Sequence, residues 1–229
     1  MVVWTRVRTG TAGTLDVWAN RYTAGSWGTR EQISTTDANS ASVTGPAGVA
    51  IDASGNAVVV WAQDADIWSN RYTAGSAAWG TAEVIRTDLG VARNPQVASD
   101  PSGNALAVWV QNNADGKSLI WSNRYTTGSG WGEAVRVETD ETHSADDPQI
   151  AIDANGNAVA VWDQQDGMRF DIWANRYTAN GWGTAALLEN DDRTSASNPS
   201  LAICPNGEAM AVWQQSDSQE QSIFSARFE

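Results

Sequence analysis

Four tryptophans stand where a sugar-binding site could use them. Each follows a glycine-containing turn and precedes a glycine: Trp27, Trp79, Trp131 and Trp182. An indole in such an open setting can stack its apolar face on the apolar face of a sugar ring. Packing at the edge of a sheet is the alternative role for an aromatic residue at this place. We take the four tryptophans as candidate ligand-binding residues, with edge packing as the competing interpretation.

A polar side chain recurs two residues after another tryptophan, in a W-x-Q phrase. Its members are Gln63, Gln111, Gln164 and Gln215. The loops that follow them differ in length between copies, and ligand sites usually lie on the variable loops of a rigid scaffold. The amide groups could also donate and accept hydrogen bonds with sugar hydroxyls. These glutamines are therefore a second set of candidate ligand-binding residues.

No residue pattern typical of an enzyme is found. His143 stands in a polar loop without a partner nucleophile in the sequence, and Cys204 has no nearby histidine. H-E-x-x-H, G-x-S-x-G and P-loop motifs are absent, as is the S-x-D-x-G-x-T-W box of sialidase-like propellers. We expect no catalytic residues, no metal ligands and no enzymatic activity. Abundant carboxylates leave a glycoside hydrolase as an alternative.

The charge balance excludes several partners. The chain has 14 Lys and Arg against 27 Asp and Glu, a net charge of −13, which opposes binding to nucleic acid. No apolar run approaches the roughly 20 residues of a membrane helix, so membrane insertion is not expected. Acidic runs at 140–147 and 189–192 are expected to be solvated, and weak Ca²⁺ binding there is the one cofactor considered.

The candidate residues belong to a repeat. The phrase DIWANRY at Asp171–Tyr177 recurs about every 50 residues, as does PQIAIDANGNAVAVW at Pro148–Trp162. Each unit predicts four short strands: PQIAID, then NAVAVW after a DANGN turn, then DIWANRY, then WGTAALLE. The alternation of side chains in DIWANRY has the period of a strand, and no helical periodicity occurs. The sequence therefore predicts an all-β propeller of four-stranded antiparallel blades.

Counting the strands predicts five blades with an incomplete first and last blade. One domain, 1–229, divides into units at 1–45, 46–94, 95–147, 148–198 and 199–229. The second and third strands occur five times, but the first and fourth only four times. A ring could close at a seam between the incomplete blades, or their open edges could pair in a homodimer.

The arginine of DIWANRY recurs in every unit, and we expect a structural role for it because a half-buried arginine must be paired. The aspartates of PQIAID are the expected partners, or they cap the following turn: Asp52, Asp100 and Asp153. Cys204 replaces this aspartate in the last unit, so the arginine there needs another partner.

The P-x-x-A-x-D-x-x-G-N phrase resembles the inner strands of NHL-type propeller repeats. The W-x-N-R-Y phrase is similar to the tryptophan-rich repeats of bacterial surface propellers and propeller lectins. This resemblance implies a non-enzymatic, multivalent carbohydrate-binding or surface-recognition module, placed outside the cell although no signal peptide is visible. The ligand would be a glycan or a protein. The alternatives are a protein-interaction scaffold that uses its acidic loop face, and a glycoside hydrolase.

Overall fold

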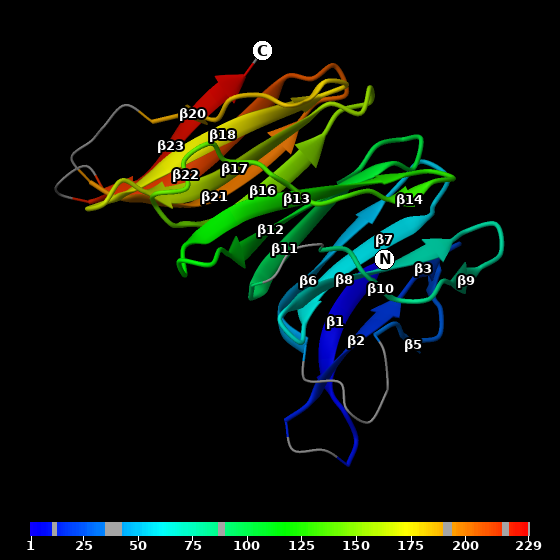
Figure 1. Cartoon of the computed structure of the whole chain (residues 1–229). Helices are drawn as coiled ribbons and strands as arrows, with labels where there is room; N and C mark the ends of the chain where they lie inside the picture. Colours follow the sequence, from blue (N-terminus) through cyan, green and yellow to red (C-terminus); the bar gives the residue numbers. More distant parts are fainter. Residues whose placement is uncertain (11–12, 35–42, 87–89, 190–193, 217–219, 229) are drawn as a thin grey trace.

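The structure is a computed structural model of the chain (Figure 1). It describes residues 1–229 except 11–12, 35–42, 87–89, 190–193, 217–219 and 229. The described residues form 23 strands and no helix, so none of them builds a helix long and apolar enough to cross a membrane.

The strands form five larger antiparallel sheets, which we call the first to fifth blades in chain order, and a separate two-stranded sheet that we assign to the first blade. The innermost strands of the second to fifth blades are β6 (Val43–Ile51), β11 (Ala92–Ser99), β16 (Ala145–Ile152) and β21 (Ala196–Ile203). The next strands outward are β1 (Val2–Val7), β7 (Ala57–Gln63), β12 (Ala105–Asn112), β17 (Ala158–Gln165) and β22 (Ala209–Ser216). The third strands are β2 (Leu15–Asn20), continued by β3 (Tyr22–Thr23), then β8 (Asp66–Thr73), β13 (Ser118–Thr126), β18 (Phe170–Thr178) and β23 (Gln221–Phe228).

Each outer strand is divided into two short pieces that pair with the strand inside it. The pieces are β4 (Ser26–Trp27) and β5 (Glu31–Gln32), β9 (Ala78–Trp79) and β10 (Glu83–Val84), β14 (Gly130–Trp131) and β15 (Val135–Arg136), and β19 (Gly181–Trp182) and β20 (Ala186–Leu187). A glycine follows each tryptophan at the break, where the chain leaves and rejoins the sheet. The predicted all-β propeller fold of four-stranded blades is confirmed.

The described residues leave the first blade without an innermost strand and the fifth without an outer one. The innermost strands of neighbouring blades contact one another, so the blades are arranged about a common axis. Figure 1 shows the first and fifth blades at opposite ends of a curved row of sheets. Among the described residues, these two blades do not meet at the closing seam that was predicted between them.

Tryptophans of the second strands fill the space between blades. Trp61, Trp109 and Trp162 are fully buried. Each indole N–H donates to the glutamine two residues later, as from Trp109 Nε1 to Gln111 Oε1 at 2.9 Å. The same bond recurs in four blades, at distances of 3.0, 2.9, 2.9 and 3.1 Å. It satisfies a donor that would otherwise be buried without a partner.

This placement corrects the ligand-binding role expected for the glutamines Gln63, Gln111, Gln164 and Gln215. All four are buried, with at most 2% of their surface exposed. Successive side chains of a strand point to opposite faces, so the glutamine shares the face of the tryptophan two residues earlier. It is therefore turned into the blade junction and away from the loop surface.

The aspartates at the ends of the innermost strands hold the tight turns. Asp100 Oδ1 accepts hydrogen bonds from the backbone N–H groups of Ser102 and Asn104, at 2.8 and 3.0 Å, and Asp52 and Asp153 repeat the pattern. Gly103 has a φ of +83°, which a glycine adopts without strain. Arg71 lies 3.7 Å from Asp52 and donates to the carbonyl of Gly103 in the next blade. In the last blade, where Cys204 replaces the aspartate, Arg227 pairs with Glu208 at 2.9 Å instead.

Replacing Gln111 by leucine should lower the free energy of unfolding by about 1–3 kcal/mol, because the Trp109 N–H would be buried without an acceptor. Chemical denaturation measures the change. Gln214→Leu, the same substitution at a half-exposed position of β22, should change stability by less than about 0.5 kcal/mol. Equal effects of the two substitutions would contradict a structural role for the buried glutamine.

Candidate functional site

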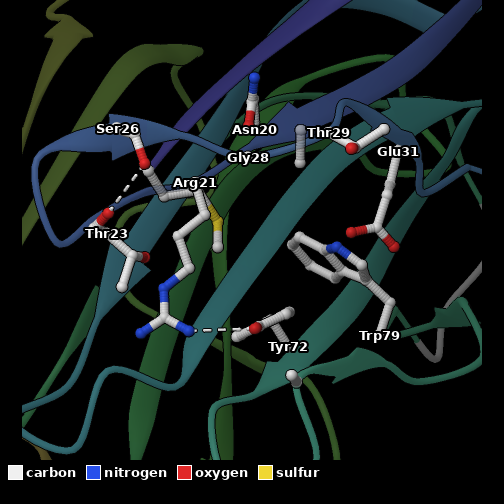
Figure 2. A pocket seen from close by; sticks show the side chains of 12 residues that line it. Asn20, Arg21, Thr23, Ser26, Gly28, Thr29, Glu31, Tyr72 and Trp79 are labelled. Carbon is white, nitrogen blue, oxygen red and sulfur yellow. Dashed lines mark hydrogen bonds between the residues drawn. The ribbon is translucent and has the colours of Figure 1, made fainter.

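The groove between the first and second blades is the clearest candidate site. It encloses about 370 Å³, within the range of small-ligand pockets. The first blade contributes polar side chains on one side, among them Asn20, Arg21 and Glu31, and the second contributes Tyr72 and Trp79 (Figure 2). One wall is therefore polar and charged, and the opposite wall is aromatic.

The strand pattern builds the aromatic wall. Tyr72 at the end of β8 pairs in register with Trp79 of β9 across the short hairpin. Their rings meet edge to face, with centroids 5.5 Å apart and planes inclined by 65°. This is a favoured geometry for aromatic pairs. The hairpin therefore fixes the orientation of both rings before any ligand arrives.

Arg21 of the first blade crosses the groove to reach the second. Its guanidinium carbon lies 4.9 Å from the centroid of the Tyr72 ring, and its Nη1 donates to the Tyr72 hydroxyl at 3.0 Å. The positive charge is thereby held over the aromatic face, a favourable cation–π arrangement. Figure 2 shows this contact at the end of the groove where Thr23 and Ser26 lie.

The same groove recurs at later junctions. Between the third and fourth blades a cavity of about 340 Å³ is lined by Arg124, Tyr177 and Trp182. Arg124 lies 5.4 Å from the Tyr177 centroid, and Arg71 lies 4.6 Å from the centroid of Tyr125 in the third blade. The arginine of one blade and the tyrosine–tryptophan pair of the next thus form one recurring unit.

The four candidate tryptophans fall into two groups. Trp79, Trp131 and Trp182 are half-buried and pack against the apolar clusters of their blade junctions, and Trp79 and Trp182 also line the two cavities. Trp27 occupies the matching face of the first blade, where 53% of it is exposed. Three of the four tryptophans therefore pack at a blade edge, and the fourth has an exposed ring. The ligand-binding role of all four stays a prediction.

Sequence reasoning overlooked the arginine and tyrosine as groove residues. The signal was present, because N-R-Y recurs in four copies with the arginine and tyrosine pointing to opposite faces of the strand. Only the arrangement of the blades shows that an arginine of one copy meets the tyrosine of the next. The repeated arginine was predicted to have a structural role, and it also lines the wall of the groove.

A second group of polar residues lies at the opposite end of the axis from the tight turns. The residue before the proline of each innermost strand has a positive φ and sits at an interruption of the strand pairing: Gly45, Asn94, Asp147 and Asn198. We call these four residues and their preceding neighbours the axial rim. Here Arg93 pairs with Asp146 of the next blade at 2.6 Å, and Asn94 donates to Asp146 at 3.1 Å.

Asp163 of β17 lies behind the axial rim, with only 5% of its surface exposed. Burial raises its pKa to about 7, and the charges of Asp147 and Asp146 act in the same direction. Its Oδ1 has no hydrogen-bond partner among the described residues. The corresponding residues of the neighbouring blades are Ala62, Val110 and Gln214. A buried carboxyl has thus replaced an apolar or amide residue in one blade only, a departure from the repeat that sequence reasoning missed.

Glu138 is a second buried carboxyl, next to the strand β13. Burial raises its pKa to about 7, although its Oε2 accepts a hydrogen bond from the Ile120 N–H at 2.6 Å. Ser34 accepts the equivalent bond, from Val17, in the first blade. Glu138 is therefore a structural acceptor whose ionisation is opposed by its surroundings.

The acidic runs considered for weak Ca²⁺ binding do not converge. Asp140 accepts from Thr142 and contacts His143 Nδ1 at 2.9 Å, and these contacts lower the pKa of Asp140 to about 2. Asp191 and Asp192 lie outside the described residues. Within the part of the chain that the structure describes, no group of three or more His, Cys, Asp or Glu side chains is placed to hold a metal ion.

No protein-family profile matches the chain, and no curated protein matches it. The predicted resemblance to NHL-type and tryptophan-rich repeats thus has no family match to support it. Among solved structures, the chain is similar to a protein of unknown function from Dyadobacter fermentans, with a TM-score of 0.66, 12% identity, and coverage of 99% of this chain and 74% of that one.

Two intramolecular trans-sialidases, from leech and from Ruminococcus gnavus, each match with a TM-score of 0.59 and 13% identity over 94% of this chain. The chain spans 36% and 50% of their respective lengths. At these identities the likeness shows the propeller fold.

The comparisons correct the expectation that the chain has no enzymatic activity. The similar structures of named activity are enzymes: the two trans-sialidases, a microbial sialidase and an ulvan lyase. The expectation rested on the near-identical repeats, because catalysis usually needs a group of residues that occurs only once. Asp163 is a position at which one blade departs from the repeat.

Stability should fall as the pH rises through the range in which Glu138 ionises. The folded state holds a proton to about pH 7, whereas an unfolded glutamate releases it near pH 4.5, so the folded state is favoured below this range and loses up to about 3 kcal/mol across it. Glu138→Gln should reduce this pH dependence in chemical denaturation, and the part that arises from Asp163 should remain. The exposed Glu83→Gln serves as control, and a pH profile unchanged by Glu138→Gln would contradict the assignment.

Proposed function

We propose that the chain binds glycans in the aromatic grooves between its blades. The observation that carries this proposal is the recurrence of one arginine–tyrosine–tryptophan unit, with cavities of about 370 and 340 Å³ at two junctions. If these residues served packing alone, neighbouring side chains would fill the space beside them, because protein interiors are closely packed. Repeated weak sites on one rigid scaffold would add avidity for a polymer with repeated units.

The groove chemistry suits a sugar ring. The ring of a pyranose has apolar C–H faces, which stack on an indole such as Trp79. Hydroxyl groups project from its edges, and the first groove offers Asn20, Ser26 and Thr29 to bind them. An aromatic wall with a few convergent polar groups is the usual composition of a small-ligand site.

The comparisons support the ligand class. The trans-sialidases, the sialidase and the ulvan lyase are named for reactions on glycans, and they share the propeller fold with this chain. Their low identity means that the support comes from the fold and not from shared site residues. The groove geometry is therefore the main argument, and the comparisons agree with it.

Trp79→Ala and Trp182→Ala should each weaken glycan binding about tenfold or more, because each removes the stacking surface of one groove. A glycan array identifies the ligand, and calorimetry gives the affinity and the number of sites. Phe170→Ala is the matched control, because this exposed aromatic side chain lines neither cavity. Binding of no saccharide, or full affinity in both groove variants, would contradict the proposal and favour the protein-interaction scaffold.

A second candidate function is cleavage of a bound glycan at the axial rim. Asp163 favours it, because a buried carboxyl that keeps its proton to about pH 7 is suited to act as a general acid. It would give its proton to the glycosidic oxygen as that bond breaks, while water adds to the sugar carbon. Asp146 and Asp147 are the neighbouring carboxylates that could take the proton of that water.

If the axial rim cleaves glycans, Asp163→Asn should lower kcat on a responsive glycoside by about 100-fold or more. The rate of the unaltered protein should also decline above about pH 7, as the acid loses its proton. A panel of chromogenic glycosides and polysaccharides provides the assay, with the exposed Asp115→Asn as control. Turnover that survives Asp163→Asn, or no turnover across the panel, would contradict this second function.

A further inference from the structure

The first groove carries opposite charges at its two ends, and this goes beyond the recurring aromatic unit. Arg21 lies beside Thr23 and Ser26 at one end, whereas the carboxylate of Glu31 lies near Trp79 (Figure 2). Tyr72 and Trp79 form the wall between them. A ligand that fills the groove therefore meets a cation at one edge and an anion at the other, with an aromatic surface along its face.

Arg21 differs from Arg71 and Arg227 in its partners. Arg71 lies 3.7 Å from the carboxylate of Asp52, and Arg227 lies 2.9 Å from that of Glu208. Arg21 has the Tyr72 hydroxyl as its hydrogen-bond acceptor, and among the described residues no carboxylate forms an ion pair with it. Its guanidinium has five N–H donors, of which the Tyr72 hydroxyl accepts one, and Nη2 lies beside the turn at Gly55 of the second blade. The N–H groups that remain can donate to an anion at this end of the groove.

Glu31 marks the first groove as different from the one between the third and fourth blades. Glu31 pairs with Ala19 of the neighbouring strand, and the residue in the same register of the third blade is Val135, opposite Ser122. The later groove therefore has an apolar side chain in this register, and its carboxylate, Glu133, lies two residues earlier in the chain. The two cavities share their aromatic wall but not their charge pattern.

A hexuronic acid matches this arrangement. Its carboxylate projects from one edge of the pyranose ring, its 2- and 3-hydroxyls project from the opposite edge, and its faces carry C–H groups. Arg21 can bind the carboxylate with two parallel hydrogen bonds. Glu31 can accept hydrogen bonds from the hydroxyls and would repel the carboxylate in the reverse orientation. Trp79 can stack on the ring face between them.

We propose that the groove between the first and second blades selects a hexuronic acid residue of a polysaccharide and holds it in one orientation, with its carboxylate on Arg21 and its hydroxyls on Glu31. This inference rests on the proposed glycan-binding function and names the sugar class of one groove. The net charge of −13 opposes a densely charged polymer. The expected ligand is therefore a chain in which uronic acids alternate with neutral sugars.

The test compares two trisaccharides that differ at one residue, a terminal glucuronic acid in the first and glucose in the second. Titration calorimetry is done on the Trp182→Ala variant, so that the groove between the third and fourth blades does not contribute. The glucuronic acid compound should bind about tenfold more tightly than the glucose compound. Arg21→Gln should abolish this preference, and Arg21→Lys should retain part of it, because lysine keeps the charge but not the fork.

Glu31→Gln should weaken the binding of both trisaccharides alike, because both offer the same hydroxyls to that end of the groove. If both trisaccharides bind with equal affinity and Trp79→Ala removes that binding, the uronate inference is overturned and the proposed glycan binding stands. A preference for glucuronic acid that persists in a folded Arg21→Gln variant would also overturn it. Failure of the groove to bind any saccharide would overturn the proposed function together with this inference.

Discussion

The hydrogen bond from a buried tryptophan to the glutamine two residues later is the interaction on which the rest of the structure depends. Each junction between blades needs a large apolar side chain to fill it, and tryptophan has the largest volume but also a polar N–H. The glutamine satisfies that N–H inside the junction, as in the pair Trp109 and Gln111. With its donor paired, the indole can be buried completely between neighbouring blades.

The repeated packing of neighbouring blades creates the grooves between them. Because each blade repeats the orientation of the one before it, the arginine at the end of one third strand meets the tyrosine of the next blade at three junctions, as Arg21 meets Tyr72. The contact joins the blades at their outer edge and also forms one wall of a cavity. Stability and recognition thus share the same residues, and differences between grooves arise where a single side chain changes, as between Glu31 and Val135.

Departures from the repeat carry the most specific functional information in this chain. Asp163 stands where neighbouring blades have Ala62, Val110 and Gln214, and a buried carboxyl with a raised pKa is costly to keep for structural reasons alone. It lies behind the axial rim, where strands of different blades bring Arg93 and Asp146 together. Repetition therefore gives the scaffold several similar grooves, and one altered blade gives it a unique group of carboxyls.

Sequence alone determined the all-β architecture and the repeated four-stranded antiparallel blade. These features follow from local patterns: the alternation of side chains in DIWANRY, the Asp–Asn–Gly turns, and a period of about 50 residues. Tertiary structure decided that Gln111 faces a buried indole, that Arg21 meets Tyr72, and that Asp163 faces Asp147. The reason is physical: a local pattern sets the direction of a side chain within its own strand, whereas its neighbour across a blade junction depends on how the sheets are arranged around the axis.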